Sequence, residues 1–216
     1  MIVANIGDFN QSTSATTFAM AVGTVSVGDL VIIFTHQGNG DCTSITDNLG
    51  NTYTKAYAYS WFWYEDVYYS TITVAGSSTL TATSGAAGYL TAQAWRATGM
   101  QSTPLDKTAG NEAGSTTPSV TMPSATATTY ELVFGMFINY AATPTSATPS
   151  SGWTKHSSYN STDGDTMDVL YQGTTATGTY SPGGTYSTSQ SWDGLLVSFK
   201  GNSALVSGTL PNLFFF

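Results

Sequence analysis

The chain has 216 residues, enough for one large domain or two small ones with an apolar core that needs no disulfide or metal. Charged residues make up 8% of the sequence, against about a quarter in an average soluble protein, and Ser, Thr, Gly and Ala replace them. The net charge of −8 and only five scattered Lys and Arg residues argue against a nucleic-acid-binding protein and against adsorption to an anionic membrane.

The first fifteen residues, 1–15, are interpreted as an N-terminal arm. They show no cationic segment, apolar segment and small-residue cleavage site in the order of a secretory signal, so we expect the chain to stay where it is made. No stretch approaches the roughly 20 apolar residues of a membrane-spanning helix. The single cysteine, Cys42, rules out an internal disulfide.

Short apolar runs rich in β-branched and aromatic residues follow, separated by Gly, Pro, Asn, Asp or Ser about every 8 to 12 residues. Helical periodicity is almost absent. The runs predict strands at 29–36, 51–60, 66–74, 78–84, 89–97, 119–123, 130–140, 165–172 and 192–200. This spacing predicts an all-β chain folded as an antiparallel β-sandwich of the jelly-roll or Ig-like type.

The segment "DNLGNTY" at 47–53 predicts a hairpin turn. Gly50 and Asn51 tolerate positive φ, and Asp47 can accept hydrogen bonds from the backbone. A cation bound by Asp47 is the alternative interpretation.

The segment "WFWYEDVYY" at 61–69 holds six aromatic residues and two acids. In a strand, alternate side chains point to opposite faces, so the aromatic residues divide between the two faces. One face can enter the core, and the other needs solvent, a second sheet, a protein partner or a sugar. The residues proposed to contact a ligand or a second subunit are Trp61, Trp63, Tyr64 and Tyr68.

Catalytic groups are scarce in the sequence. Glu65 and Asp66 are neighbours and point to opposite faces of a strand, so they cannot form the flanking carboxylates of a glycosidase. His36, Cys42 and His156 are the candidates for nucleophilic chemistry, but no oxyanion signature accompanies them. We therefore predict no catalytic residues and a protein that is not an enzyme.

Several residues recur at one offset. Met20 matches Met122 (122 − 20 = 102), and the same offset relates three further groups of residues. These are Asp29, Leu30 and Val31 with Glu131, Leu132 and Val133; Asp66, Val67 and Tyr69 with Asp168, Val169 and Tyr171; and Gly99 with Gly201. The offset predicts two pseudo-repeats of about 100 residues, at 16–99 and 116–201, joined by a crossing at 100–115. It leaves open whether they form two sandwiches or share one.

The matching stretch of the second repeat, "DGDT" at 163–166, holds no aromatic residue, so the aromatic surplus favours a contact role. Asp163, Asp165 and Asp168 predict a solvated acidic loop or, alternatively, a Ca²⁺ site, although the EF-hand pattern is absent. No other cofactor is predicted.

Residues 202–216 form an apolar tail without a counterpart after the first repeat. Burying one Phe is worth about 2 kcal/mol, so we expect the tail to be covered. It either lies across its own domain or anchors into a neighbouring subunit. The anchor residues would be Leu210, Leu213, Phe214, Phe215 and Phe216.

The segments "GDLVIIFTHQ", "SITDNLGNTYT", "LTAQAWRATG" and "PLDKTAG" resemble a β-sandwich module of phage virion and tail accessory proteins and of bacterial surface proteins. The matching positions are Gly28, Asp29, Leu30, Val31, Thr46, Asp47, Gly50, Asn51, Thr52, Tyr53, Gly99, Pro104, Leu105 and Asp106. The resemblance covers about 20–201 and leaves out the tail. Asn48 and the aromatic segment 61–69 depart from the pattern.

The resemblance implies a virion part, and the low charge and missing signal agree with it. The first hypothesis is a non-enzymatic structural protein on the exterior of a tailed-phage particle, either a head decoration (cement) protein or a tail component. It would assemble in the host cytoplasm as a homo-oligomer, for example a trimer, with other virion proteins. The alternative is an extracellular carbohydrate-binding or adhesive module that binds a cell-surface glycan. Neither hypothesis includes nucleic acid or a membrane span.

Overall fold

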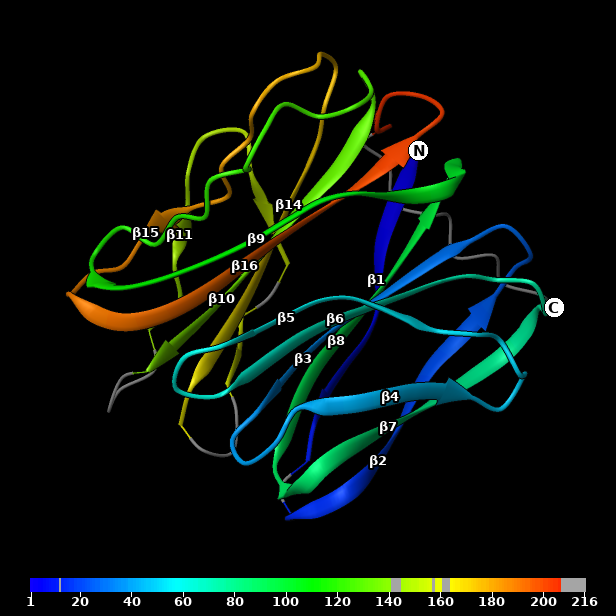
Figure 1. Cartoon of the computed structure of the whole chain (residues 1–216), viewed down its shortest axis with the longest axis horizontal. Coiled ribbons are helices and arrows are strands. Elements are labelled where there is room, and N and C mark those ends of the chain that lie inside the picture. Colours follow the sequence, from blue (N-terminus) through cyan, green and yellow to red (C-terminus); the bar gives the residue numbers. More distant parts are fainter. Residues whose placement is uncertain (12, 141–144, 157, 161–163, 207–216) are drawn as a thin grey trace, which may run out of the picture.

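The computed structural model describes residues 1–206 except 12, 141–144, 157 and 161–163, and these residues form strands and loops without a helix (Figure 1). The strands are β1 (Ile2–Asn10), β2 (Ala15–Val25), β3 (Leu30–Gln37), β4 (Cys42–Asp47), β5 (Thr54–Ser60), β6 (Tyr64–Thr71), β7 (Gly76–Gly88), β8 (Leu90–Thr98), β9 (Met100–Ser115), β10 (Glu131–Tyr140), β11 (Thr148–Pro149), β12 (Thr154–Lys155), β13 (Tyr159–Asn160), β14 (Thr166–Gly173), β15 (Gly184–Thr185) and β16 (Gln190–Gly201). The prediction of an all-β antiparallel β-sandwich is confirmed.

The strands form three main sheets. The central sheet has the order β1-β8-β3-β6-β5, and the outer sheet has the order β2-β7-β4. The second-half sheet has the order β12-β14-β10-β16-β9, with β13 also paired to β14. The central sheet lies between the other two (Figure 1).

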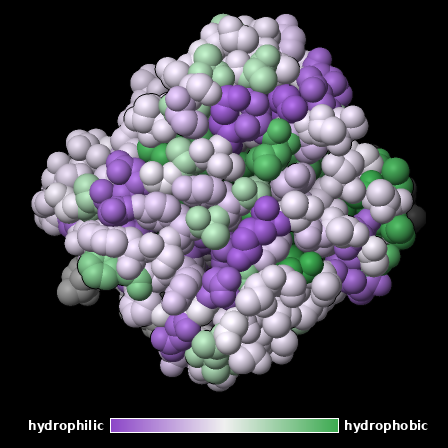
Figure 2. Space-filling view, in the orientation of Figure 1, coloured by the Kyte–Doolittle hydropathy of each residue, from purple (hydrophilic) through white to green (hydrophobic). Residues whose placement is uncertain are grey.

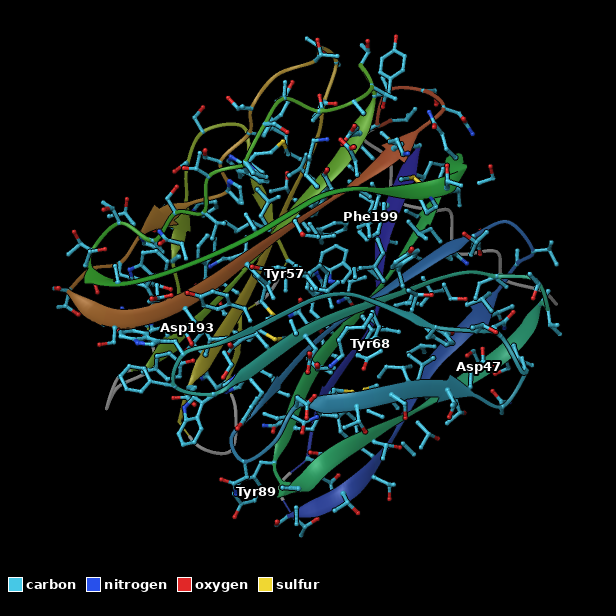
Figure 3. All side chains as sticks on the ribbon, viewed as in Figure 1. Asp47, Tyr57, Tyr68, Tyr89, Asp193 and Phe199 are labelled. Carbon is cyan, nitrogen blue, oxygen red and sulfur yellow. The ribbon has the colours of Figure 1, made fainter. Side chains whose placement is uncertain are left out.

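The largest core fills the space between the central and second-half sheets. Rings from the two sheets meet there, with centroids 5.3 Å apart for Phe34 and Phe134 and 5.5 Å apart for Tyr69 and Phe199. Figure 3 shows Tyr57 and Phe199 in this region. The buried members include Leu30, Ile32, Val67, Trp95, Leu132, Met136, Ile138, Met167, Val169, Leu195 and Val197.

Two further cores lie on the other faces of these sheets. The outer sheet covers the central one with Phe18, Met20, Val22, Ile45, Leu80 and Ala82. Loops cover the far face of the second-half sheet with Val120, Met122, Ala147 and Tyr186. Because both faces of the central sheet are covered, every residue of β3 is buried, which explains its continuous apolar run.

The two halves use the same strand pairing. Phe34 of β3 lies opposite Val67 of β6, and Met136 of β10 lies opposite Val169 of β14, an offset of 102 in both strands (136 − 34; 169 − 67). The ladders of β3 with β8 and of β10 with β16 share the same offset. Both halves therefore contribute a sheet to one shared core. That the halves are pseudo-repeats stays a prediction.

Some predicted elements were wrong. Residues 119–123 form no strand and contribute only an isolated bridge between Ser119 and Gly183. Strands at 2–10, 15–25 and 100–115 were not predicted, so the arm is an edge strand of the central sheet and the crossing is an edge strand of the second-half sheet.

The turn at 47–53 keeps its predicted cap but is not a hairpin. The Asp47 carboxylate accepts the N–H groups of Leu49 and Asn51 at 3.0 and 2.9 Å, and Gly50 has a φ of +83°. β4 belongs to the outer sheet and β5 to the central sheet, so the segment carries the chain from one sheet to another. Asp47 (labelled in Figure 3) thus caps a crossover.

The surface reflects the composition. The face in Figure 2 is mostly pale, with small hydrophilic and hydrophobic groups scattered over it. Few large hydrophobic side chains are exposed among the described residues. Three of them, Trp61, Phe62 and Tyr64, lie in one short segment of the chain. The end of β16 continues to Leu205, which packs against the shared core, and the proposed anchor residues 210–216 lie outside the described residues.

Candidate functional site

The aromatic segment forms the end of the β5–β6 hairpin. Residues 61–63 are a bend and β6 begins only at Tyr64, so 61–69 is not one continuous strand as predicted. Trp61 is 45% exposed, Phe62 54% and Tyr64 37%, whereas Trp63 is half-buried. We call residues 61–64 the aromatic tip. Three of its rings are exposed to solvent, whereas the side chains of the core are buried.

The aromatic tip rests on the last residue of β10. The ring of Phe62 meets that of Tyr140 edge to face at 5.4 Å between centroids, and Trp61 lies 4.3 Å from Phe62. This small stack crosses from the central sheet to the second-half sheet.

Beneath the tip, four strand ends bring polar side chains together inside the protein. His36 comes from β3, Glu65 from β6 and Asp193 from β16, while Asp165 directly precedes β14. His36 is 2% exposed, Glu65 1% and Asp193 0%. Figure 3 shows the position of Asp193 on β16. We call these residues, together with Tyr140, the acid cluster.

The contacts within the acid cluster form a chain between the two sheets. His36 Nδ1 lies 3.3 Å from Glu65 Oε1, and His36 Nε2 lies 3.3 Å from Asp165 Oδ2. The Tyr140 hydroxyl lies 3.1 Å from Glu65 Oε1 and 2.8 Å from Asp193 Oδ2. Glu65 Oε2 has no hydrogen-bond partner among the described residues.

Burial and neighbouring charges shift the acid–base properties of the cluster. Burial opposes a charged His36, but its contacts with Asp165 and Glu65 dominate and raise its pKa to about 9. Burial and the charge of Glu65 raise the pKa of Asp193 to about 6, although Tyr140 and the Phe62 backbone favour the ionised form. Burial and the same carboxylates raise the pKa of Tyr140.

The sequence did not predict the acid cluster. Glu65 and Asp193 come from different sheets, and only their shared contact with Tyr140 shows that they are neighbours. The one signal in the sequence was that polar residues stand at the ends of several predicted strands. A strand-by-strand interpretation could not say which ends meet.

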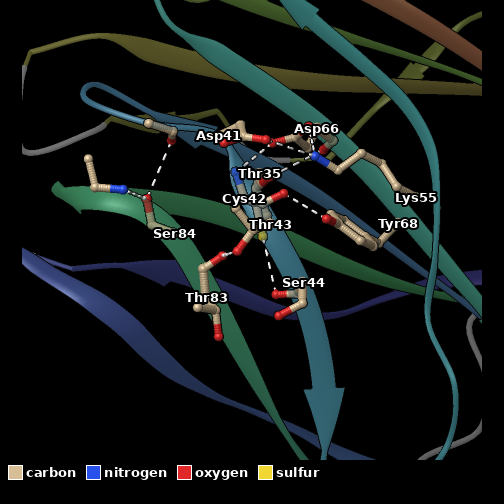
Figure 4. A network of polar contacts seen from close by, with 12 residues as sticks. Thr35, Asp41, Cys42, Thr43, Ser44, Lys55, Asp66, Tyr68, Thr83 and Ser84 are labelled. Atoms are coloured by element: carbon tan, nitrogen blue, oxygen red, sulfur yellow. Dashed lines mark hydrogen bonds and ion pairs between the residues drawn. The ribbon is translucent and has the colours of Figure 1, made fainter.

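A second polar network lies on the other face of the central sheet (Figure 4). The buried Asp66 accepts the N–H of Cys42 at 2.7 Å and pairs with Lys55 Nζ at 2.9 Å. Burial raises the pKa of Asp66 against the effect of Lys55. Tyr68 donates its hydroxyl to the Cys42 carbonyl at 2.6 Å. These contacts join β4 to the central sheet.

Tyr68 was predicted as a contact residue and the structure does not support this. Its side chain is 3% exposed and packs between the central and outer sheets (labelled in Figure 3). Of the four predicted contact residues, Trp61 and Tyr64 are exposed at the tip and Trp63 is half-buried there.

The other predicted residues are dispersed. Asp165 contacts His36, whereas Asp168 accepts the Ala147 N–H at 2.7 Å and pairs with Lys155 at 3.5 Å; Asp163 lies outside the described residues. Among the described residues, no three His, Cys, Asp or Glu side chains form a group suited to a metal ion.

The two groups considered for nucleophilic chemistry in the first half do not meet. Cys42 donates its thiol to the Ser44 carbonyl at 3.5 Å, and His36 contacts carboxylates instead. Burial raises the pKa of Cys42 to about 12, which disfavours the thiolate. His156 lies 3.3 Å from Asp8 at the surface.

Comparison of the chain with known protein families, with curated proteins and with solved structures gives no match. Within the part of the chain that the structure describes, no helix is long and apolar enough to cross a membrane.

Proposed function

We propose that this chain is a non-enzymatic structural protein on the exterior of a tailed-phage particle, as a head decoration protein or a tail component. It assembles with other copies and with further virion proteins through its β-sandwich surfaces. The aromatic tip is the main contact, and the apolar tail at 202–216 is a second anchor.

The observation that carries this proposal is the exposure of the aromatic tip. The side chains of Trp61 and Phe62 are each about half exposed. Exposed rings of this size lower the solubility of a monomer, and packing of the core does not require them. Aromatic residues that leave solvent at an interface commonly supply much of its binding energy. The few charges on this chain also lower the repulsion between copies.

The test is the mass of the full chain in solution, measured by light scattering. We expect a trimer or a larger assembly, and we expect replacement of Trp61 and Phe62 by Ser to dissociate it at least partly. The matched control replaces Val27 and Val74, two exposed apolar residues away from the tip, by Ser and should leave the mass unchanged. A monomeric full chain at high concentration would contradict assembly through this surface.

The second candidate function is carbohydrate binding by an adhesive module of a bacterial surface protein. It is favoured by the exposed indole of Trp61 and by the nearby rings of Trp63 and Tyr64, since flat exposed rings stack against sugars. A glycan array would test it. Binding that the Trp61→Ser variant loses would support this candidate, and an array without any ligand would remove it.

A further inference from the structure

Tyr140 makes more contacts with carboxylate oxygens than its single hydroxyl hydrogen can serve. A phenol carries one hydrogen, yet the Tyr140 oxygen lies within hydrogen-bond distance of carboxylate oxygens on both Glu65 and Asp193. Tyr140 can donate to only one of them. The other contact is a hydrogen bond only if that carboxyl group carries a proton and donates it to Tyr140.

The surrounding charges favour placing that proton on Asp193. Asp193 faces Glu65 of β6 across Tyr140 of β10, with His36 of β3 and Asp165 beyond Glu65. On its own sheet it lies opposite Glu112 of β9, whose charge also disfavours a second carboxylate. His36 contacts two of these carboxyl groups, Glu65 and Asp165, at 3.3 Å each.

The aromatic tip packs on Tyr140, whose hydroxyl makes the two contacts that depend on this proton. Phe62 packs against the ring of Tyr140, and its backbone lies close enough to Asp193 to favour the ionised form. If both carboxyl groups ionise, one contact of Tyr140 becomes a repulsion between two oxygen lone pairs. Both carboxyl groups are buried, so ionising both of them in place costs free energy unless water reaches them.

We propose that Glu65, Tyr140 and Asp193 form a proton-controlled latch that holds the aromatic tip. With Asp193 protonated, Asp193 donates to Tyr140, Tyr140 donates to Glu65, and the tip is docked. When the proton leaves, the bridge fails, the carboxylates repel each other and the tip undocks to admit water. In the setting of the proposed function, the latch regulates the contact surface, so acid would favour the docked tip and neutral pH the free one.

Asp193 loses its proton within a pH range that ordinary buffers cover. The pKa of Asp193 lies at about 6, so its proton is mostly present at pH 5 and mostly absent at pH 7.5. His36 keeps its proton through this range, because its pKa is about 9. A single proton change therefore separates the two states.

The experiment follows the tip directly in the full chain. The protein is labelled with 5-fluorotryptophan, and the fluorine NMR signals of Trp61 and Trp63 are assigned with the Trp61→Phe and Trp63→Phe variants. Spectra are recorded from pH 4.5 to 8.5. We expect the fluorine signal of Trp61 to move with a midpoint near pH 6. Acrylamide quenching of the fluorescence of Trp61, taken as the difference between the wild type and Trp61→Phe, should rise about twofold across that midpoint.

Two variants separate the latch from other causes. In Asp193→Asn, the amide donates to Tyr140 in place of the proton, so the Trp61 signal should stay at its low-pH position throughout. In Tyr140→Phe, the bridge is absent and the signal should stay near its high-pH position. The control Asp41→Asn changes an exposed carboxyl outside the cluster and should leave the midpoint unchanged.

The proposal is overturned if the wild-type Trp61 signal does not change between pH 4.5 and 8.5, or if Asp193→Asn keeps the same midpoint. Circular dichroism verifies that each variant is folded, and the wild-type titration decides the matter if a variant is not. No partner is needed, so the latch can fail while assembly through the tip holds, and the reverse.

Discussion

Asp66 and Asp168 occupy matching positions in the two halves (168 − 66 = 102), yet their surroundings differ. Each is buried, accepts one backbone N–H at 2.7 Å and pairs with a lysine, Lys55 or Lys155. Asp168 also accepts hydroxyls from Ser146 and Ser158. In both halves the strand therefore positions the carboxylate, whereas the loops determine how many uncharged hydrogen-bond donors contact it.

The largest expected effect is that of Lys55→Met. The change leaves Asp66 buried with one backbone donor, and an uncompensated buried charge costs about 3 to 5 kcal/mol. Urea denaturation should show a free energy of unfolding lowered by that amount. The double variant with Asp66→Asn should recover part of the loss, and a Lys55→Met variant as stable as wild type would show that Asp66 does not depend on Lys55.

A smaller loss is expected for Lys155→Met. Asp168 keeps its backbone donor and the two serine hydroxyls, so the unfolding free energy should fall by only about 1 to 2 kcal/mol. The same urea experiment measures it. If both lysine variants lose equal stability, the serines do not compensate and the contrast between the halves fails.

The smallest effect concerns position 68, which is Tyr in the first half and corresponds to Leu170 in the second (170 − 68 = 102). Tyr68→Phe removes the donor to the buried Cys42 carbonyl and should cost about 1 kcal/mol, as a lower thermal midpoint. Tyr64→Phe, at an exposed ring, is the control and should change stability by less than about 0.5 kcal/mol.

Much of the scaffold could be predicted because its central strands are continuous apolar runs, as in β3 and β10. β9 was missed because Gly, Ser, Thr, Asn and Ala make up much of it, and β1 was missed because Asn, Gly and Asp interrupt its apolar residues; Gly, Asn, Asp and Ser are common in turns as well. A local pattern also does not reveal that both faces of a sheet are covered. For this reason Tyr68 was expected at the surface and lies in the core.

The candidate site was predicted only in its local part. Trp61 and Tyr64 were identified because an aromatic surplus is visible in the sequence itself. Tyr140 and Asp193 were not, since their meeting with Glu65 depends on how two sheets pack. A long-range acid pair was outside the reach of spacing rules, which compare residues within one strand or loop.

The shared core has a consequence for synthesis of the chain. The first half leaves the ribosome with the central sheet complete at Thr98, while the strands that cover one of its faces, β10, β14 and β16, follow later. Translation at about 5 to 20 residues per second leaves that apolar face bare for roughly 5 to 20 seconds. During this interval the nascent chain depends on chaperones or on low local concentration to avoid aggregation, so its yield is set in part before the second half exists.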